Sequence, residues 1–194
     1  MNISTDDIKA LREKTSVSIM QCKKALEDAG GDMEQAIVLL KKRAGAIAEK
    51  KSGRDLGAGT IASYLHTGEV GALVMLSCET DFVGKNEDFV ALARDIAMQI
   101  AASDAKFITE EEITPEAREA AHTVFLEEVK DKPEDMREKI LEGKMQAYFK
   151  DMVLMSQPFI KDQAKTIADL LSEATQKFGE RIEVTRIARF SVRG

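Results

Sequence analysis

Cys78 and His66 are the two side chains in this sequence whose types could together perform covalent chemistry. A thiolate activated by a neighbouring imidazole is the nucleophile in several classes of enzyme. The alternative, which we favour, is that Cys78 ends a core strand and His66 ends the neighbouring strand near a turn. The sequence contains no nucleophile elbow, phosphate-binding loop, dinucleotide-binding glycine pattern or metal-binding helix motif. We therefore expect no enzymatic activity and no cofactor.

Metal binding is disfavoured by the number and spacing of the possible ligands. The two cysteines, Cys22 and Cys78, form no CxxC pair, and the two histidines, His66 and His122, are far apart in the sequence. We expect no metal site. Two isolated thiols are typical of a reducing compartment, the first residues lack the features of a signal peptide, and no apolar run approaches the ~20 residues that span a bilayer. The predicted location is the cytoplasm.

The composition is that of a globular protein with an acidic surface. Of the 194 residues, 44% are hydrophobic and 32% are charged, which is enough for a packed core without disulfides. The net charge is −6, and the acidic excess falls after residue 50. Duplex nucleic acid requires a basic face, and the absence of Trp argues against stacking on single strands. We expect neither nucleic acid nor a membrane as a partner.

Residues 1–45 predict three short helices joined by tight turns. Ser18-x-x-Gln21 and Asp32-x-x-Gln35 have the form of capping boxes, and glycines 30 and 31 are suited to end the second helix. The apolar stripe of that helix comprises Ile19, Cys22, Ala25, Leu26 and Ala29. Residues 46–58 are basic and then glycine-rich, which predicts a linker. We favour a tether over a nucleic-acid patch there, because few basic residues are involved.

Residues 59–194 predict an α+β core in which helices pack on a three-stranded antiparallel sheet. Strands over residues 60–66 and 70–77 form a hairpin, and a helix over residues 86–102 follows. Thr114-Pro115 begins a projecting helical hairpin that extends to about residue 152. A helix ending at Phe178 precedes the last strand. Five apolar residues of that strand are assigned to one face: Ile182, Val184, Ala188, Phe190 and Val192.

Thr80, Asp81, Phe82 and Val83 follow the second strand, where the chain should turn into solvent. In one interpretation Phe82 folds back into the core and Asp81 caps the following turn, and the residue types alone favour this slightly. In the other interpretation the strand presents Phe82 as an apolar anchor, and Asp81 fixes its approach by hydrogen bonds. Aromatic anchors dominate the binding energy of many protein interfaces. The residues alone leave both interpretations open.

Several blocks of the sequence, taken in order, resemble bacterial elongation factor Ts over essentially the whole chain. They are residues 8–15, 20–26, 31–36, Cys78 with residues 80–83, residues 157–161, and residues 189–190. The resemblance implies that residues 1–45 form a ubiquitin-associated-like module. It also reverses the preference for Phe82, since Val83 and Phe89 would then pack into the core and leave Phe82 facing outward.

The resemblance implies a guanine nucleotide exchange factor that acts on elongation factor Tu in translation elongation. Phe82 would insert into a pocket of that partner near its magnesium and phosphate site, and Asp81 would hold neighbouring groups. Both would weaken the binding of GDP, so that it is released. Thr80 and Val83 belong to the same motif. The N-terminal contact with the partner would use Arg12, Ile19, Met20 and Lys23, and His66 would contribute a contact from the core. Ile19, Ser16 and Ser18 depart from the family pattern, which usually has glycines before Met20.

Two further expectations concern assembly and the alternatives. Because the chain carries one set of core strands, the resemblance implies a homodimer. The runner-up function is a non-catalytic adaptor or chaperone-like protein that binds peptides or ubiquitin-like folds through residues 1–45. A thiol enzyme based on Cys78 and His66 ranks third.

Overall fold

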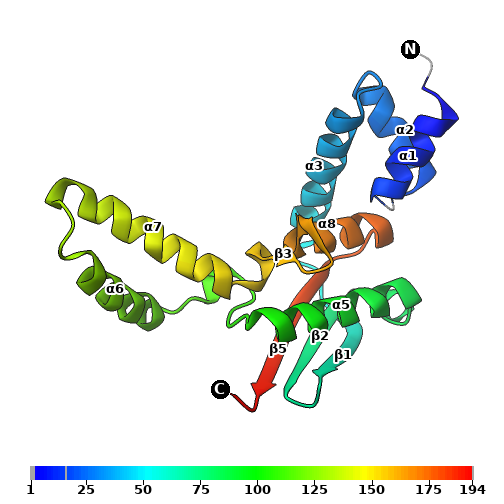
Figure 1. The fold of residues 1–194 in the computed structure, drawn as a ribbon. Helices are drawn as coiled ribbons and strands as arrows, with labels where there is room; N and C mark the ends of the chain where they lie inside the picture. The colour runs from blue at the N-terminus through cyan, green and yellow to red at the C-terminus, as the bar shows by residue number, and fades with distance from the viewer. Residues whose placement is uncertain (1–2, 16, 194) are drawn as a thin grey trace. The chain divides into compact units, whose positions relative to one another are not determined.

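The computed structural model describes residues 3–15 and 17–193 (Figure 1), so the departure at Ser16 lies outside the described residues. The fold is α+β, as predicted. Its helices are α1 (Thr5–Thr15), α2 (Ile19–Asp28), α3 (Met33–Lys51), α4 (Asp81–Gly84), α5 (Glu87–Ser103), α6 (Pro115–Val129), α7 (Glu134–Met152) and α8 (Ile167–Phe178), with short 3-10 helices η1 (Glu110–Glu112) and η2 (Leu154–Ser156). Its strands are β1 (Ala58–His66), β2 (Val70–Cys78), β3 (Pro158–Phe159), β4 (Asp162–Thr166) and β5 (Ile182–Ser191).

The main sheet has three strands in the order β1-β2-β5, so β2 is the central strand (Figure 1). The predicted three-stranded antiparallel sheet is confirmed. A small antiparallel pair of β3 and β4 was not predicted. None of the helices in the described part of the chain is long and apolar enough to cross a membrane.

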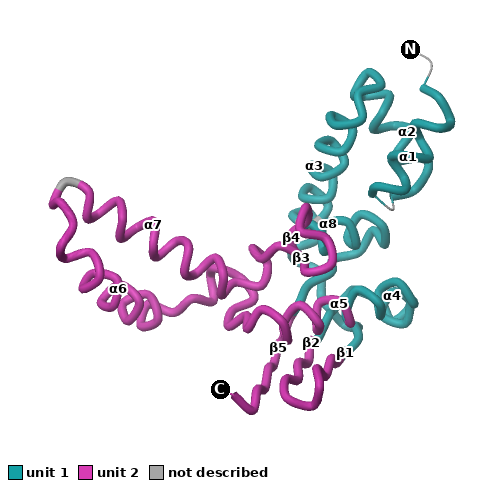
Figure 2. The backbone as a smooth tube through the Cα atoms, viewed as in Figure 1, with its two compact units in different colours: residues 1–62, 75–93, 168–184 teal, residues 63–74, 94–167, 185–194 magenta. Residues whose placement is uncertain are grey.

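The contacts between residues divide the chain into two compact units (Figure 2). Unit 1 contains described residues of 1–62, 75–93 and 168–184, and unit 2 contains those of 63–74, 94–167 and 185–194. The predicted boundary near residue 58 does not separate these units. The three N-terminal helices and the Thr80–Val83 motif fall in the same unit.

The three N-terminal helices form with the predicted caps. The Asp32 carboxylate accepts a hydrogen bond from the Gln35 backbone N–H at 2.9 Å, and Ser18 caps α2. At the end of α2 the N–H of Gly31 donates to the Leu26 carbonyl at 2.8 Å, and Gly30 and Gly31 both have positive φ. The small core contains Leu11, Val17, Cys22, Ala25, Leu26 and Leu40 among others. Ile19 is not in it: Val17 is fully buried, whereas Ile19 is 55% exposed.

The predicted linker over residues 46–58 is wrong in its first part, because α3 continues to Lys51. The helix is supported by long-range contacts. The Lys41 amine lies 2.8 Å from the Asp169 carboxylate, and the Gln176 amide donates to the Leu40 carbonyl at 2.7 Å. Both partners belong to α8. Residues 46–51 are therefore helical.

Helices α6 and α7 form the predicted antiparallel hairpin (Figure 1). Thr114 caps α6, since its hydroxyl accepts from the Ala117 N–H at 3.2 Å, and Pro115 occupies the first turn. The apolar contact between the helices centres on buried Ala121 and Phe149.

The last strand, β5, is buried mainly at its start. Ile182 and Val184 are buried, but Phe190 is 74% exposed. The adjacent Arg189 contacts the Ala101 carbonyl and the Asp104 carboxylate at the end of α5 through its guanidinium. Neighbouring side chains on a strand point to opposite faces, so Phe190 faces away from α5. Phe190 and Val192 are therefore exposed, unlike Ile182 and Val184.

Candidate functional site

The Thr80–Val83 motif forms a single helical turn, α4, immediately after β2. Thr80 has an extended backbone, with φ −124° and ψ 153°, and its side chain accepts from the Val83 N–H. Thr80 is therefore the N-cap of the turn, and the interpretation in which Asp81 caps it was wrong. The Asp81 carboxylate instead pairs with Lys85, one turn further on, at 2.8 Å. This hydrogen bond lowers the pKa of Asp81.

Phe82 and Val83 point in opposite senses from this turn. Phe82 is 81% exposed, whereas Val83 is 4% exposed. Successive residues of a helix are rotated by about 100°, so a turn that buries Val83 directs Phe82 to solvent. Phe89 is fully buried and packs edge-on against Phe178, with 6.0 Å between the ring centroids. The outward position of Phe82 and the inward positions of Val83 and Phe89 are confirmed.

Glycine is required where the turn passes β1. A Cβ on Gly84 would lie 3.0 Å from the Gly59 carbonyl oxygen, and a Cβ on Gly59 would lie 2.4 Å from the Leu76 oxygen. Gly59 also has φ +157°, which L-residues rarely adopt. The backbone of Gly84, the last residue of α4, therefore lies close to the backbone of Gly59 on β1, and this contact holds the end of the turn against the sheet.

The Glu180 carboxylate holds the residues just before the turn. Its Oε2 accepts hydrogen bonds from the backbone N–H groups of Glu79 and Thr80 at 3.1 and 3.0 Å, and its Oε1 accepts from the Thr80 hydroxyl at 2.7 Å. The Thr80 carbonyl in turn accepts from the Cys78 thiol and from the Gly84 N–H, both at 3.1 Å. Every polar atom of Thr80 is thus bonded within the protein, although Thr80 lies at the surface.

The Glu79 carboxylate joins three segments of unit 1. It lies 2.9 Å from the Lys51 amine and 2.7 Å from the Arg54 guanidinium, and it accepts from the Arg181 backbone N–H at 2.7 Å. Lys51 also donates to the Gly179 carbonyl. Burial tends to raise the pKa of Glu79, but the Arg181 N–H and the two cations outweigh it and lower the pKa to about 2. Glu79 is therefore ionised at neutral pH.

Cys78 and His66 do not form a thiol–imidazole pair. His66 stands at the hairpin turn that leads into β2, and Cys78 ends that nine-residue strand, which spans roughly 26 Å. The His66 Nδ1 lies 3.2 Å from the Tyr64 hydroxyl. Burial raises the pKa of the Cys78 thiol, which opposes formation of the thiolate. The side chains that could have supported a thiol enzyme are bonded elsewhere.

The predicted N-terminal contact residues all lie at the surface. Met20 is 82% exposed and Ile19 is 55% exposed at the start of α2, and Arg12 on α1 is exposed as well. Lys23 lies 3.8 Å from Glu27 in an exposed pair. Two adjacent exposed apolar side chains on a helix that also carries Lys23 form a surface that a protein partner could cover.

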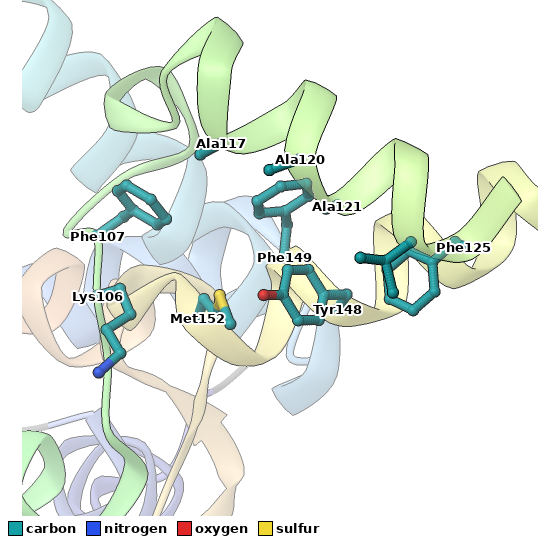
Figure 3. Close-up of a pocket in the computed structure, with 10 residues that line it drawn as sticks. Lys106, Phe107, Ala117, Ala120, Ala121, Phe125, Tyr148, Phe149 and Met152 are labelled. Atoms are coloured by element: carbon teal, nitrogen blue, oxygen red, sulfur yellow. The ribbon is translucent and has the colours of Figure 1, made fainter. Parts of the chain in front are cut away.

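An apolar cavity of about 580 Å³ lies between α6 and α7 (Figure 3). The rings of Phe125 and Phe149 lie edge-on to Tyr148, with centroids 5.3 and 5.2 Å away. Alanines and Met152 supply most of the remaining wall. A lining of this kind offers no acid–base pair or nucleophile. Within residues 3–15 and 17–193, no group of three or more His, Cys, Asp or Glu side chains is arranged to hold a metal ion.

Sequence reasoning missed Glu79, Glu180, Lys51 and Arg54 around the motif. Each is an ordinary charged residue in its local sequence, and its role depends on a partner that is distant along the chain. Glu180 and Thr80, for example, are 100 residues apart. The one local signal is Gly179, whose φ of +67° ends α8 and places Glu180 in a turn.

Comparisons with known proteins cover the chain almost completely. The family model described as Elongation factor TS matches residues 9–194. The chain is 47% identical to the elongation factor Ts of Thermodesulfovibrio yellowstonii, covering 99% of this chain and 97% of the relative. It is 46% identical to that of Koribacter versatilis, covering 99% and 89%, and 47% identical to that of Leptospira biflexa, covering both chains fully. The chain therefore belongs to the elongation factor Ts family of translation elongation factors.

Proposed function

We propose that this protein is a guanine nucleotide exchange factor that binds elongation factor Tu and accelerates the release of GDP. The observation that carries the proposal is Phe82, a large apolar side chain that is 81% exposed on a turn whose neighbours are fixed. A phenylalanine left in water forgoes roughly 1.5–3 kcal/mol of burial free energy. Insertion into a partner's pocket recovers that free energy, and the fixed turn limits the entropy lost on binding.

The chemistry of the neighbouring side chains supports a site near bound nucleotide. Asp81 presents an exposed carboxylate beside Phe82, and its lowered pKa keeps it ionised at neutral pH. A carboxylate placed next to the GDP phosphates repels them and can also compete for Mg²⁺, which prefers oxygen ligands. Phe82 and Asp81 would thus raise the free energy of the GDP-bound partner without any covalent step.

Exchange of this kind is a coupling between two binding equilibria. If the factor binds nucleotide-free elongation factor Tu more tightly than the GDP-bound form, GDP must weaken the binding of the factor to elongation factor Tu by the same ratio. The acceleration of GDP release therefore depends only on the difference in the factor's affinity for the nucleotide-free and GDP-bound forms. Cellular nucleotide concentrations then decide which nucleotide rebinds.

The N-terminal helices would make a second contact with the same partner, through Met20, Ile19, Arg12 and Lys23. Two contacts on one chain raise the effective concentration of the second once the first has formed. Met20 and Phe82 belong to the same compact unit, which supports a joint contribution to binding. His66, exposed at the hairpin turn, would contribute a further contact from the core. The protein would act in the cytoplasm, where translation elongation takes place.

We also propose that the protein forms a homodimer. In unit 2 the exposed apolar side chains include Leu65 and Leu73, 69% and 46% exposed, and Phe190 and Val192, 74% and 76% exposed. Exposed apolar surface on a sheet is typical of subunit interfaces, and a second copy of the chain would bury it. Light scattering should give a dimer mass for the native protein and a monomer mass for Leu73→Glu.

Binding measurements with the two forms of elongation factor Tu test the exchange function. Isothermal titration should give a markedly tighter Kd for the nucleotide-free form than for the GDP form. The same ratio should separate the Kd values of GDP for the partner with and without this protein. Equal affinities for the two forms would contradict the proposal. Tight binding without any change in GDP affinity would instead favour the non-catalytic adaptor.

A further inference from the structure

We propose that Glu180 is a positioning residue for nucleotide exchange, which acts through Thr80 to hold the turn that presents Phe82. The inference rests on the proposed exchange function. Glu180 does not belong to the Thr80–Val83 motif and lies 100 residues from Thr80 along the chain. Its carboxylate nevertheless accepts three hydrogen bonds from the two residues that precede the turn.

The geometry shows how this carboxylate determines the direction of Phe82. Oε1 accepts a hydrogen bond from the Thr80 hydroxyl, with 2.7 Å between the two oxygens. The hydroxyl oxygen can therefore use its lone pairs to cap the turn by accepting from the Val83 N–H. Oε2 fixes the Thr80 N–H at 3.0 Å. The Glu180 carboxylate thus sets both the cap of α4 and the direction in which the backbone enters it. It does so at Thr80, two residues before Phe82.

The two chain segments hold each other reciprocally. Glu180 accepts from the backbone N–H groups of Glu79 and Thr80, while the Glu79 carboxylate accepts from the backbone N–H of Arg181 at 2.7 Å. Lys51 bonds both Glu79 and the Gly179 carbonyl, so the segment that carries Glu180 is itself fixed. Charge-assisted hydrogen bonds of this type are stronger and more directional than neutral ones.

A purely structural role for Glu180 would predict something different. Phe82 makes little contact with the rest of the protein, being 81% exposed, so the fold gains little from directing it. What the arrangement does fix is the approach of an exposed ring. A displacement of about 1 Å in a positioned group can lower a rate by roughly 100-fold. Loss of the carboxylate should therefore lower exchange far more than it lowers folding.

The first experiment measures GDP release from elongation factor Tu as a function of factor concentration for Glu180→Ala. We expect the maximal release rate to fall by about 10- to 100-fold. The concentration for half-maximal stimulation should change by less than about threefold, because the other contacts remain. Glu183→Ala is the matched control: it removes the same side chain three residues further on, where the carboxylate pairs with the Arg181 guanidinium. This control should exchange at the native rate.

A double-mutant cycle tests whether Glu180 acts through Thr80. Thr80→Val removes the hydroxyl while keeping the size of the side chain. If the two residues form one unit, the combined variant should lose no more activity than the more defective single variant. Additive losses would contradict a route through Thr80. Thr80→Ser, which keeps the hydroxyl, should restore most of the activity lost in Thr80→Val.

A spectroscopic experiment reports the order of the turn without reference to exchange. The chain contains no tryptophan, so Phe82→Trp introduces a single indole at the tip. We expect Glu180→Ala to lower the fluorescence anisotropy of this indole in the free protein, while the far-ultraviolet circular dichroism spectrum is retained. Unchanged anisotropy together with unchanged exchange in Glu180→Ala would overturn the positioning role. If Phe82→Ala itself exchanged at the native rate, the proposed function would fail instead, so the two failures are distinguishable.

Discussion

Glu79→Gln should destabilise the protein in a manner that depends on pH. The substitution keeps the size of the side chain but removes the charge that pairs with Lys51 and Arg54. The pKa of Glu79 is about 2 in the folded protein, against an ordinary value of 4.5, and each pKa unit corresponds to ~1.4 kcal/mol. The full difference would amount to roughly 3 kcal/mol. The Arg54 side chain is more than half exposed. Solvent screening therefore reduces the expected loss of unfolding free energy to about 1–3 kcal/mol.

The direction of the pH dependence follows from the sign of the shift. A carboxyl whose pKa is lower in the folded than in the unfolded state binds fewer protons when folded. Its contribution is complete above about pH 4.5 and is lost as the pH falls towards 2. The difference in unfolding free energy between the native protein and Glu79→Gln should therefore be largest near neutral pH. Less than half of it should remain at about pH 3.

Urea unfolding followed by circular dichroism measures this difference. Glu128→Gln is the matched control, because Glu128 pairs with Lys144 at 2.7 Å and both side chains are more than 40% exposed. An exposed pair of this type contributes roughly 0–1 kcal/mol. The reasoning would be refuted if Glu79→Gln cost no more than Glu128→Gln at neutral pH. A cost that did not change between neutral pH and about pH 3 would also refute it.

Three further predictions concern glycines and the N-terminal surface. Gly59→Ala should cost about 1–3 kcal/mol of unfolding free energy, because its Cβ would lie 2.4 Å from the Leu76 carbonyl oxygen. Gly143→Ala, inside α7 with nothing within 4 Å of the new Cβ, should instead stabilise the protein by up to about 1 kcal/mol. Urea unfolding checks both, and the same sign for the two would contradict the packing argument. Met20→Ser, at an 82% exposed position, should leave stability within about 0.5 kcal/mol and weaken binding to elongation factor Tu by about tenfold in titration.

The sequence predicted those features that depend on neighbouring residues. The caps at Asp32 and Thr114 and the helix end at Gly31 involve partners within five residues, and all three formed as expected. The sequence also predicts that Val70, Ala72, Val74 and Leu76 alternate to one side of the second strand; the last three are buried and Val70 is partly buried. Local patterns of this kind carry their own physical cause, so one sequence is enough to recognise them.

Features that depend on distant partners were not predicted. Residues 46–58 were predicted to form a linker, but α3 continues to Lys51, whose amine lies 2.9 Å from the Glu79 carboxylate. The support of the Phe82 turn by Glu180 could not be inferred, because nothing in the local sequence of Glu180 differs from an ordinary surface turn. The outward position of Phe82 required the family resemblance, since residue type alone slightly favoured the core.

The release of GDP from elongation factor Tu by the native protein and by Phe82→Ala tests the central claim most directly. Because Phe82 is 81% exposed, the variant should unfold at the same urea concentration as the native protein. Stopped-flow measurement with a fluorescent GDP analogue should show strong acceleration by the native protein and, for Phe82→Ala, a loss of at least about tenfold, which corresponds to ~1.4 kcal/mol. Native acceleration by a folded Phe82→Ala variant would contradict the account.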